Sequence, residues 1–276
     1  MRICSRLFVL LCTAFCFSQS FAAERLSLGL VPYSTAASLI KTHAPLRDYL
    51  NRTLDSTSTT FFVPSDYATF YKEALTGKFD VVSASAHFVP GLLRQGYVPL
   101  VQYGTRLKFT VIVHKDSPIQ KAEDLRGKRL GLPGFLSMYY VYADEWLKRN
   151  DLYNAVYMIP LGAHETGMER IAEGQLDAMF ATPQNLAQLP PELRSRLKSL
   201  DITKISFPSL AYLAHRNLGA KKIAQLKRLL EAFPTSAEGQ VFFGKNTAYG
   251  GFKPLTPKDI EEVQPYGRLT DKLLGL

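Results

Sequence analysis

Six short polar segments carry the side chains best able to contact a ligand. Each follows a predicted strand, and several place a hydroxyl or a small residue where the next helix begins. The unpaired N–H groups at a helix N-terminus, together with the helix dipole, favour an anion. Ser, Thr and Asp are also ordinary N-cap residues, so one such segment does not establish a site. The segments that together predict a small-molecule site are 32–35, 65–67, 83–85, 133–137, 162–166 and 182–184.

His164 opens a run that begins like the zinc-protease motif HExxH. Met168 stands where the second histidine of that motif would be, and the other histidines lack metal-ligand spacing. We therefore expect no metal site. A single histidine between a strand and a helix suits either a local hydrogen bond or a contact with a ligand, and the residue types favour neither.

Sequence motifs of common enzyme active sites are missing from the chain. It has no Gly-x-Ser-x-Gly nucleophile elbow and no phosphate-binding P-loop. Val31-Pro32-Tyr33 follows the first predicted strand, where a dinucleotide-binding protein has its glycine-rich fingerprint. We expect a binding protein that has no catalytic residues and no cofactor.

Aromatic and thioether side chains lie close to one of the polar segments. Such residues fill protein cores more often than binding sites. A different oxyanion, or a ligand compatible with aromatic side chains, is nevertheless an alternative to a simple phosphate-like ligand. The residues concerned are Phe135, Met138, Tyr139 and Tyr140.

The first 22 residues have the layout of a secretory signal peptide. Arg2 and Arg6 precede an apolar run at 7–17, and Ser20-Phe21-Ala22 provides small residues for cleavage. The apolar run is too short for a membrane-spanning helix. We expect cleavage after Ala22 and release into the periplasm.

All the cysteines of the chain, Cys4, Cys12 and Cys16, fall within this predicted signal peptide. A lipoprotein signal is an alternative, but Leu11 and Phe15 occupy positions where such a signal needs a small residue. The exported chain would contain no thiol. That suits an oxidising compartment, where stray thiols form wrong disulfides.

Length and charge point to a globular binding protein. Removing 22 of the 276 residues leaves 254, which is enough for two lobes with hydrophobic cores. The loss of Arg2 and Arg6 lowers the basic residues from 33 to 31 against 24 acidic ones, a net charge of +7. A basic receptor favours an anionic ligand, although these scattered residues also suit solvated surface. No nucleic-acid motif and no later apolar run long enough to span a membrane are present.

Strand and helix patterns alternate along the first part of the chain. Short apolar runs ended by Pro or Gly predict strands, and apolar residues at helical spacing predict helices. The predicted strands are 26–31, 59–63, 79–83, 98–103 and 109–114. The predicted helices are 36–51, 67–75 and a short one that ends at Gln95.

The pattern restarts after the turn signal Lys115-Asp116-Ser117-Pro118. Further strands are predicted at 129–132, 156–160, 176–181 and 209–214. Helices are predicted up to Arg149, at 166–173, partly at 184–198, at 221–233, at 236–243 and near Asp259.

Alternating β and α elements imply parallel sheets with helices on both faces. Two such series suggest two lobes, one formed by residues 24–107 and 209–276 and the other by residues 108–208. The connections near Arg106 and Phe207 would form a hinge. Because ligands of open α/β sheets bind at the carboxyl ends of the strands, we expect a ligand cleft between the lobes.

The chain resembles the phosphonate-binding proteins of ABC transporters, a branch of the type II periplasmic binding proteins. The resemblance covers nearly all of the predicted mature chain. Lys115-Asp116-Ser117-Pro118 and Asp124-Leu125-Arg126-Gly127-Lys128 are shared by many type II proteins and indicate the fold. The resemblance is also clear in Pro64-Ser65-Asp66-Tyr67, in Phe79-Asp80-Val81 and from His164-Glu165-Thr166 to Gly174-Gln175-Leu176-Asp177-Ala178. Of these, Asp66-Tyr67 and the run from Gly162 to Thr166 are more specific to the phosphonate branch.

The resemblance implies an α/β protein of two lobes, each a mostly parallel sheet flanked by helices, with the ligand cleft between them. It implies that Tyr67 and His164 face the ligand and that the loop after Leu132 holds an anion. Residues expected to contact the ligand, from the loops and the resemblance together, are Tyr33, Ser34, Tyr67, Ser85, Ser137, Tyr139, His164, Glu165, Thr166 and Gln184.

Two features depart from the family pattern. Where the family has a Ser/Thr cluster that binds the phosphonate oxygens, residues 133–138 of this chain keep one hydroxyl, that of Ser137. We expect Phe135 and Leu136 to remove donors there and to add apolar bulk where the oxygens would lie. Gln184 aligns with the family's acidic residue that receives a ligand amine. Weak binding of aminoalkylphosphonates is therefore predicted.

The function implied is that of a periplasmic, monomeric substrate-binding protein that captures a small ligand for an ABC transporter, such as an oxyanion of the phosphate or phosphonate class. The alternative is a periplasmic protein that presents its ligand-bound form to a membrane sensor kinase or cyclase. No nucleic-acid partner is expected.

Overall fold

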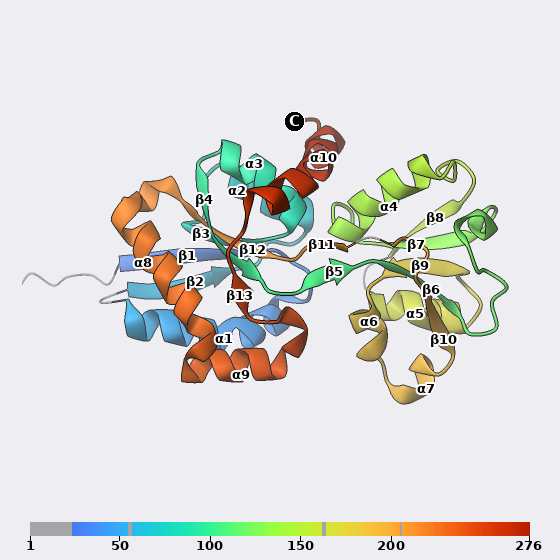
Figure 1. Cartoon of the computed structure of the whole chain (residues 1–276), viewed down its shortest axis with the longest axis horizontal. Coiled ribbons are helices and arrows are strands. Elements are labelled where there is room, and N and C mark those ends of the chain that lie inside the picture. The colour runs from blue at the N-terminus through green and yellow to red at the C-terminus, as the bar shows by residue number, and fades with distance from the viewer. Residues whose placement is uncertain (1–23, 55–56, 162–163, 205) are drawn as a thin grey trace, which may run out of the picture.

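A computed structural model of the chain describes residues 24–54, 57–161, 164–204 and 206–276 (Figure 1). The predicted signal peptide and its cysteines lie outside the described residues. Figure 1 shows two α/β lobes side by side. Lobe 1 is built on a six-stranded sheet and lobe 2 on a five-stranded sheet. Helices flank both sheets, so the predicted α/β fold class is confirmed.

The sheet of lobe 1 has the strand order β13-β4-β12-β3-β1-β2. β1 runs parallel to β2 and β3, whereas β12 runs antiparallel to β3 and β4. β12 has the opposite direction because it enters the sheet from lobe 2 and does not follow a helix of the same sheet. The strands are β1 (Glu24–Leu30), β2 (Thr57–Phe62), β3 (Val81–Ala84), β4 (Tyr97–Tyr103), β12 (Ala211–His215) and β13 (Phe252–Lys253).

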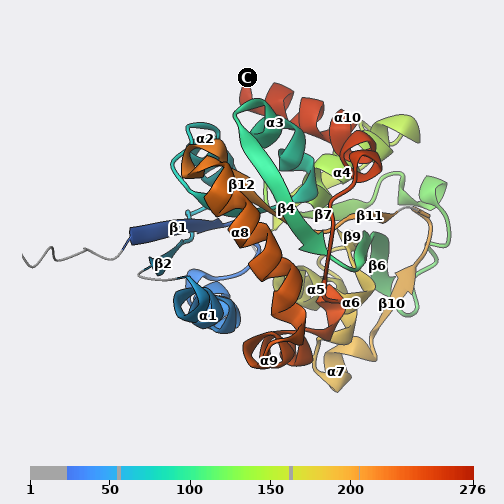
Figure 2. The same ribbon diagram turned by 60° about the vertical axis from the view of Figure 1, so that its left-hand side comes forward.

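Helices cover both faces of this sheet. Leu213 of β12 belongs to the core under α2 and α3, whereas its neighbours Tyr212 and Ala214 belong to the core under α1, α8 and α9. This alternation is the two-residue period of a strand. Figure 2 brings α8 and α9 to the front. The helices are α1 (Ala36–Thr53), α2 (Tyr67–Leu75), η1 (Ala86–Phe88), α3 (Val89–Arg94), η3 (Arg216–Leu218), α8 (Gly219–Ala232), η4 (Phe233–Thr235), α9 (Ala237–Lys245), η5 (Thr247–Tyr249) and α10 (Pro257–Leu274).

Lobe 2 has the strand order β10-β6-β9-β7-β8, with β7 parallel to β8 and β9 and the other pairs antiparallel. Val111 and Val113 face the core under α4, and Ile112 between them faces the core under α5. The strands are β6 (Thr110–His114), β7 (Arg129–Pro133), β8 (Tyr157–Leu161), β9 (Ala178–Ala181) and β10 (Leu197–Leu200). The helices are η2 (Ala122–Leu125), α4 (Met138–Arg149), α5 (His164–Ala172), α6 (Pro183–Ala187) and α7 (Pro191–Arg194).

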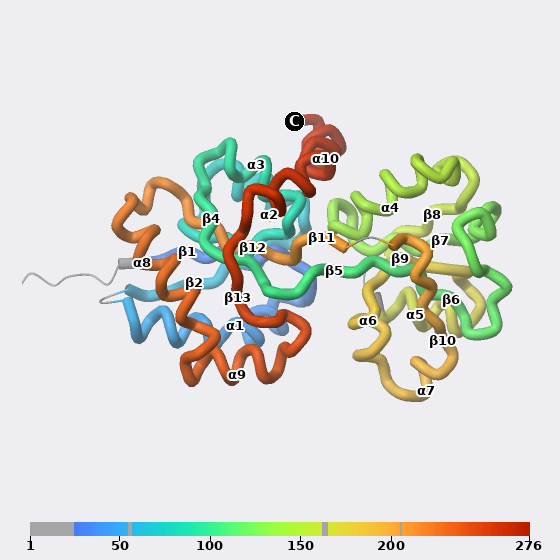
Figure 3. Tube along the Cα trace, in the orientation of Figure 1, coloured from blue at the N-terminus to red at the C-terminus, as the bar shows by residue number. Residues whose placement is uncertain are grey.

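The chain passes between the lobes at β5 (Arg106–Lys108) and β11 (Ser206–Pro208), which pair with each other antiparallel. Figure 3 shows the two segments running side by side between the lobes. They hold Arg106 and Phe207, where the sequence predicted the connections. The exact lobe boundaries and a hinge motion at these strands stay predictions.

The last helix, α10, joins the lobes in a second way. It packs on η1 and α3 of lobe 1 and also contacts α4 of lobe 2. Val263 and Tyr266 of α10 lie in the same buried cluster as Phe207 and Tyr142. The sequence predicted a helix near Asp259 that returns to lobe 1, but not its packing against lobe 2.

Some strands fall where the sequence pattern predicted something else. β10 lies at the end of the stretch predicted as partly helical, and β5, β11 and β13 are too short to give a pattern. In the part of the chain that the structure describes, no helix is both long enough and apolar enough to cross a membrane.

Candidate functional site

A cleft of about 700 Å³ lies between the lobes. Lobe 1 contributes the loops that follow β1 and β2, and lobe 2 contributes the loop that follows β7 together with parts of α5 and α6. The cleft is therefore at the carboxyl ends of parallel strands, where α/β proteins bind ligands. Its lining includes Pro32, Tyr33, Ser34, Thr35, Ala36, Val63, Pro64, Ser65, Tyr67, Pro133, Gly134, Ser137, Glu165, Asn185, Gln188 and Leu189.

The structure brings about half of the candidate residues together in this cleft. Those in its lining are Tyr33, Ser34, Tyr67, Ser137 and Glu165. Ser85 is buried, and Thr166 and Gln184 are exposed outside the lining. Tyr139 is half-buried behind it, and the side chain of His164 is outside the described part of the structure. Asn185, which the sequence interpretation missed, lines the cleft in place of Gln184.

Helices α1, α2 and α4 begin at the cleft, and α5 and α6 bring Glu165 and Asn185 to it from their first turns. The hydroxyl of Thr35 caps α1 by accepting from the N–H of Ser38, and the carboxylate of Asp66 caps α2 by accepting from that of Thr69. Ser137 caps α4 in the same way, with 3.2 Å between its Oγ and the nitrogen of Tyr140. Each cap satisfies one N–H of a first turn, and the preceding ones have no acceptor within the helix. The positive ends of these helix dipoles thus meet at one cavity.

Cationic side chains are missing from the described lining. Among the described residues that form it, Glu165, in the first turn of α5, has the one charged side chain. Asp66 lies beside the lining, and the N–H of Thr69 lowers the pKa of its carboxyl group. An anion in this cleft would be bound by amides and hydroxyls, not by lysine or arginine.

Tyrosines provide hydroxyl groups around the cleft. The hydroxyls of Tyr33 and Tyr249 lie 2.8 Å apart, and that of Tyr139 donates to Oδ1 of Asn185 over 3.1 Å. Burial raises the pKa of Tyr33 well above its ordinary value and that of Tyr139 to about 12. Burial also raises the pKa of Tyr67. These phenols are therefore protonated at neutral pH and can donate hydrogen bonds.

Tyr67 and Gly134 meet across the cleft. A Cβ atom added to Gly134 would lie 3.4 Å from a ring carbon of Tyr67, so the ring rests on the glycine backbone. Gly134 also has a φ of +40°, which side chains disfavour. An added methyl group would make ordinary van der Waals contact with the ring, so the positive φ is the feature that favours glycine here.

The loop after β7 does not place apolar bulk in the cleft, which corrects the expectation from the sequence. Leu136 has a φ of +61°, and its side chain is fully buried in the core of lobe 2. Phe135 is 50% exposed and packs edge-on against Tyr140, outside the lining. Burial of an apolar side chain is favourable by about 1.5–3 kcal/mol, which explains why Leu136 turns inward. The hydroxyl of Ser137, which caps α4, also donates to the carbonyl of Pro133, so both contacts are within its own loop and helix.

The model of the family described as the periplasmic substrate-binding protein of phosphonate ABC transporters matches residues 28–260. The chain belongs to this family. It is a periplasmic substrate-binding protein that captures a small ligand for an ABC transporter. A comparison with curated protein sequences found no significant match.

Solved structures of other proteins share this fold. XAC2383 from Xanthomonas citri, described as bound to chloride ion, has a TM-score of 0.77 and 18% identity over 90% of this chain and 98% of its own. PhnD1 from Prochlorococcus marinus, in complex with methylphosphonate, has a TM-score of 0.76 and 16% identity over 91% and 99%. The aliphatic sulphonate binding protein SsuA from Escherichia coli has a TM-score of 0.64 and 17% identity over 92% and 94%.

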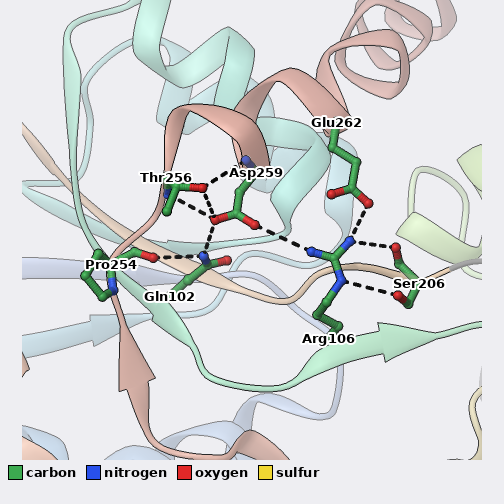
Figure 4. Close-up of polar contacts among 7 residues, drawn as sticks. All are labelled: Gln102, Arg106, Ser206, Pro254, Thr256, Asp259 and Glu262. Carbon is green, nitrogen blue, oxygen red and sulfur yellow. Dashed lines mark hydrogen bonds and ion pairs between the residues drawn. The ribbon is translucent and has the colours of Figure 1, made fainter.

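In this binding protein the connection between the lobes is fastened by a polar cluster (Figure 4). Arg106 of β5 donates to the carbonyl of Ser206 over 2.8 Å and to its hydroxyl over 3.2 Å. The same guanidinium pairs with Glu262 and lies 3.5 Å from Asp259, both on α10. Asp259 in turn accepts from Gln102 over 2.7 Å. One arginine thus ties both crossing strands to the last helix.

Proposed function

We propose that the ligand is a small tetrahedral oxyanion of the phosphate or phosphonate class. The observation that carries this proposal is the meeting of three helix N-termini at a cleft whose described lining has no cationic side chain. First-turn amides bind an anion through hydrogen bonds of about 1.5–3 kcal/mol each, and they need no counter-charge. Methylphosphonate, the ligand of the neighbour PhnD1, is a suitable first probe.

In this proposal both lobes contribute residues that contact the ligand. Tyr33, Ser34 and Tyr67 hold it from lobe 1, and the loop at 133–137 holds it through the backbone at the start of α4. Glu165 and Asn185 are the polar side chains of α5 and α6 that line the ligand site on the lobe 2 side. The other residues predicted from the sequence and the resemblance stay proposed ligand contacts, which a closing motion would bring to the ligand: Ser85, Tyr139, His164, Thr166 and Gln184.

Capture would occur by rotation of the lobes about β5 and β11, with lobe 1 formed by residues 24–107 and 209–276 and lobe 2 by residues 108–208. We propose that the protein acts as a monomer, leaves its ligand chemically unchanged and docks on the permease of its transporter. Export would depend on cleavage of the signal peptide at residues 1–22.

Titration calorimetry with methylphosphonate and with inorganic phosphate tests this function. Tyr67→Ala should weaken binding about tenfold to a hundredfold, because a hydrogen bond to a charged ligand is lost. Tyr157→Ala is the matched control, since Tyr157 is 66% exposed on β8 and outside the cleft lining. Equal affinities of both variants and the wild type, or no binding of either probe at millimolar concentration, would refute the proposal.

A further inference from the structure

A buried histidine of lobe 1 contacts the loop at 133–137, which follows β7 of lobe 2. His87 lies in η1 and is fully buried, and its Nε2 is 3.0 Å from the carbonyl oxygen of Leu136. A carbonyl oxygen can only accept, so Nε2 carries the proton and donates. Nδ1 has no partner in the described structure, and burial lowers the pKa of His87 to about 3. The ring is therefore neutral, and its tautomer is fixed by this one hydrogen bond.

The peptide group that His87 binds directly precedes the cleft-facing helix α4. Its carbonyl belongs to Leu136, and its N–H, that of Ser137, donates to the carbonyl of Gly134 over 2.9 Å. The group is thus held at both ends. Leu136 has a φ of +61°, a conformation that non-glycine residues adopt only when neighbouring contacts hold them there.

His87 is itself held firmly. Its ring centroid lies 4.2 Å from that of Phe88. A Cβ atom on Gly267 of α10 would come within 3.2 Å of the carbonyl oxygen of His87, so the helix packs directly on this segment. The donor is in place before a ligand arrives, which is the condition for a positioning role.

We propose that His87 is a positioning residue for ligand binding: its Nε2–H binds the Leu136 carbonyl and so keeps this acceptor away from the anion while the first-turn amides of α4 stay open to the cleft. The role in affinity rests on the proposed function, whereas the role in loop order does not. His87 is absent from the cleft lining, so it acts through the loop and does not touch the ligand.

His43 provides a matched control. It is also a fully buried histidine of lobe 1, with Nδ1 at 2.9 Å from the carbonyl of Leu39 and with Nε2 unpartnered. The difference is the acceptor, because Leu39 belongs to the same helix as His43. Loss of either ring removes one buried hydrogen bond, but loss of His87 alone releases the loop.

Hydrogen exchange of the ligand-free protein, read on peptides that cover residues 133–141, tests the loop role. His87→Leu should raise the exchange rate of this segment about tenfold, whereas His43→Leu should leave it unchanged. His87→Gln keeps a donor of similar reach and should restore slow exchange, and His87→Asn is too short and should not. The Gln and Asn pair decides the question even when His87→Leu does not fold. Equal exchange in all these variants would overturn the proposal.

Calorimetry with methylphosphonate tests the consequence for binding. His87→Leu and His87→Asn should weaken affinity about tenfold, while His87→Gln and His43→Leu stay close to the wild type. Faster loop exchange with unchanged affinity would overturn the positioning role. When the wild type binds no probe, the proposed function fails, and the exchange experiment still decides whether His87 orders the loop.

Discussion

The ring of Tyr266, on the last helix, packs edge-on against Phe207 on the crossing strand β11, with 4.8 Å between the ring centroids. Tyr142 of lobe 2 completes the contact at 5.4 Å from Phe207. The last helix therefore closes an apolar core over the connection between the lobes. Arg106 fastens the same helix from its polar side. A rotation of the lobes, as proposed, would take place against these contacts.

Removal of Tyr266 should loosen the lobes as well as lower stability. Tyr266→Ala deletes a buried aromatic ring, which costs about 3–5 kcal/mol of the free energy of unfolding. We expect a larger radius of gyration of the ligand-free protein by small-angle scattering. Tyr49→Ala is the control, because Tyr49 is equally buried but packs on Phe233 within lobe 1. An equal radius in both variants would show that α10 does not brace the lobes.

A methyl group at Gly134 should weaken ligand binding. Gly134→Ala strains a residue with a φ of +40° and adds a methyl group to the cleft lining, in van der Waals contact with the ring of Tyr67. Gly174→Ala is matched in strain, with a φ of +76°, but nothing lies within 4 Å of its added Cβ. Both variants should lose about 1 kcal/mol of stability. Only Gly134→Ala should reduce the affinity for methylphosphonate measured by calorimetry. A lower affinity of Gly174→Ala than of Gly134→Ala would contradict the placement of the ligand in this cleft.

Stability should fall as the pH drops below 6.5. Burial lowers the pKa of His43 to about 4 and that of His87 to about 3, from an ordinary value of 6.5. Between pH 6.5 and 4 the unfolded chain takes up protons that the folded chain does not. Each histidine then costs up to about 1.4 kcal/mol per pH unit. Urea denaturation from pH 7.5 to 4.5 measures how the free energy of unfolding changes with pH. His43→Leu and His87→Leu should each reduce this slope, and an unchanged slope would show that these histidines do not stay neutral in the folded protein.

Simple phosphonates should bind better than aminoalkylphosphonates. The loop at 133–137 has one side-chain hydroxyl, that of Ser137. It accepts from the N–H of Tyr140 and donates to the carbonyl of Pro133, so side-chain donors are few. Gln184, which aligns with the family's amine-receiving acid, is exposed outside the lining. Competition between methylphosphonate and 2-aminoethylphosphonate checks this order. Submicromolar binding of 2-aminoethylphosphonate would contradict it and would point to Glu165 as the ammonium partner.

Local signals predicted much of the fold. The helix at 67–75 was predicted with its observed bounds, because Asp66 caps it and Gly77 follows its end. β10 is four residues long, which is too short for its strand pattern to stand out from the helical pattern before it. Its partner β6 lies more than 80 residues earlier in the chain, so only the tertiary fold selects the strand.

The site was harder to predict than the fold. Loops after strands identified Tyr33, Ser34 and Tyr67, because the carboxyl ends of strands meet at one edge. The direction of Leu136 depends on a positive φ that a leucine does not signal. On the short helix α6, a difference of one residue decides that Asn185, not Gln184, lines the cleft. The contact between His87 and Leu136 joins the two lobes, and nothing local in the sequence indicates it.

In the proposed function, the first-turn amides of the helices at the cleft bind the anion. Amide chemical shifts of the ¹⁵N-labelled protein, followed during titration with methylphosphonate, test it most directly. We expect saturable shifts that are largest for Ala36, Tyr67, Met138 and Tyr139, at the starts of α1, α2 and α4. Saturable binding that shifts other amides and leaves these unchanged would contradict the account.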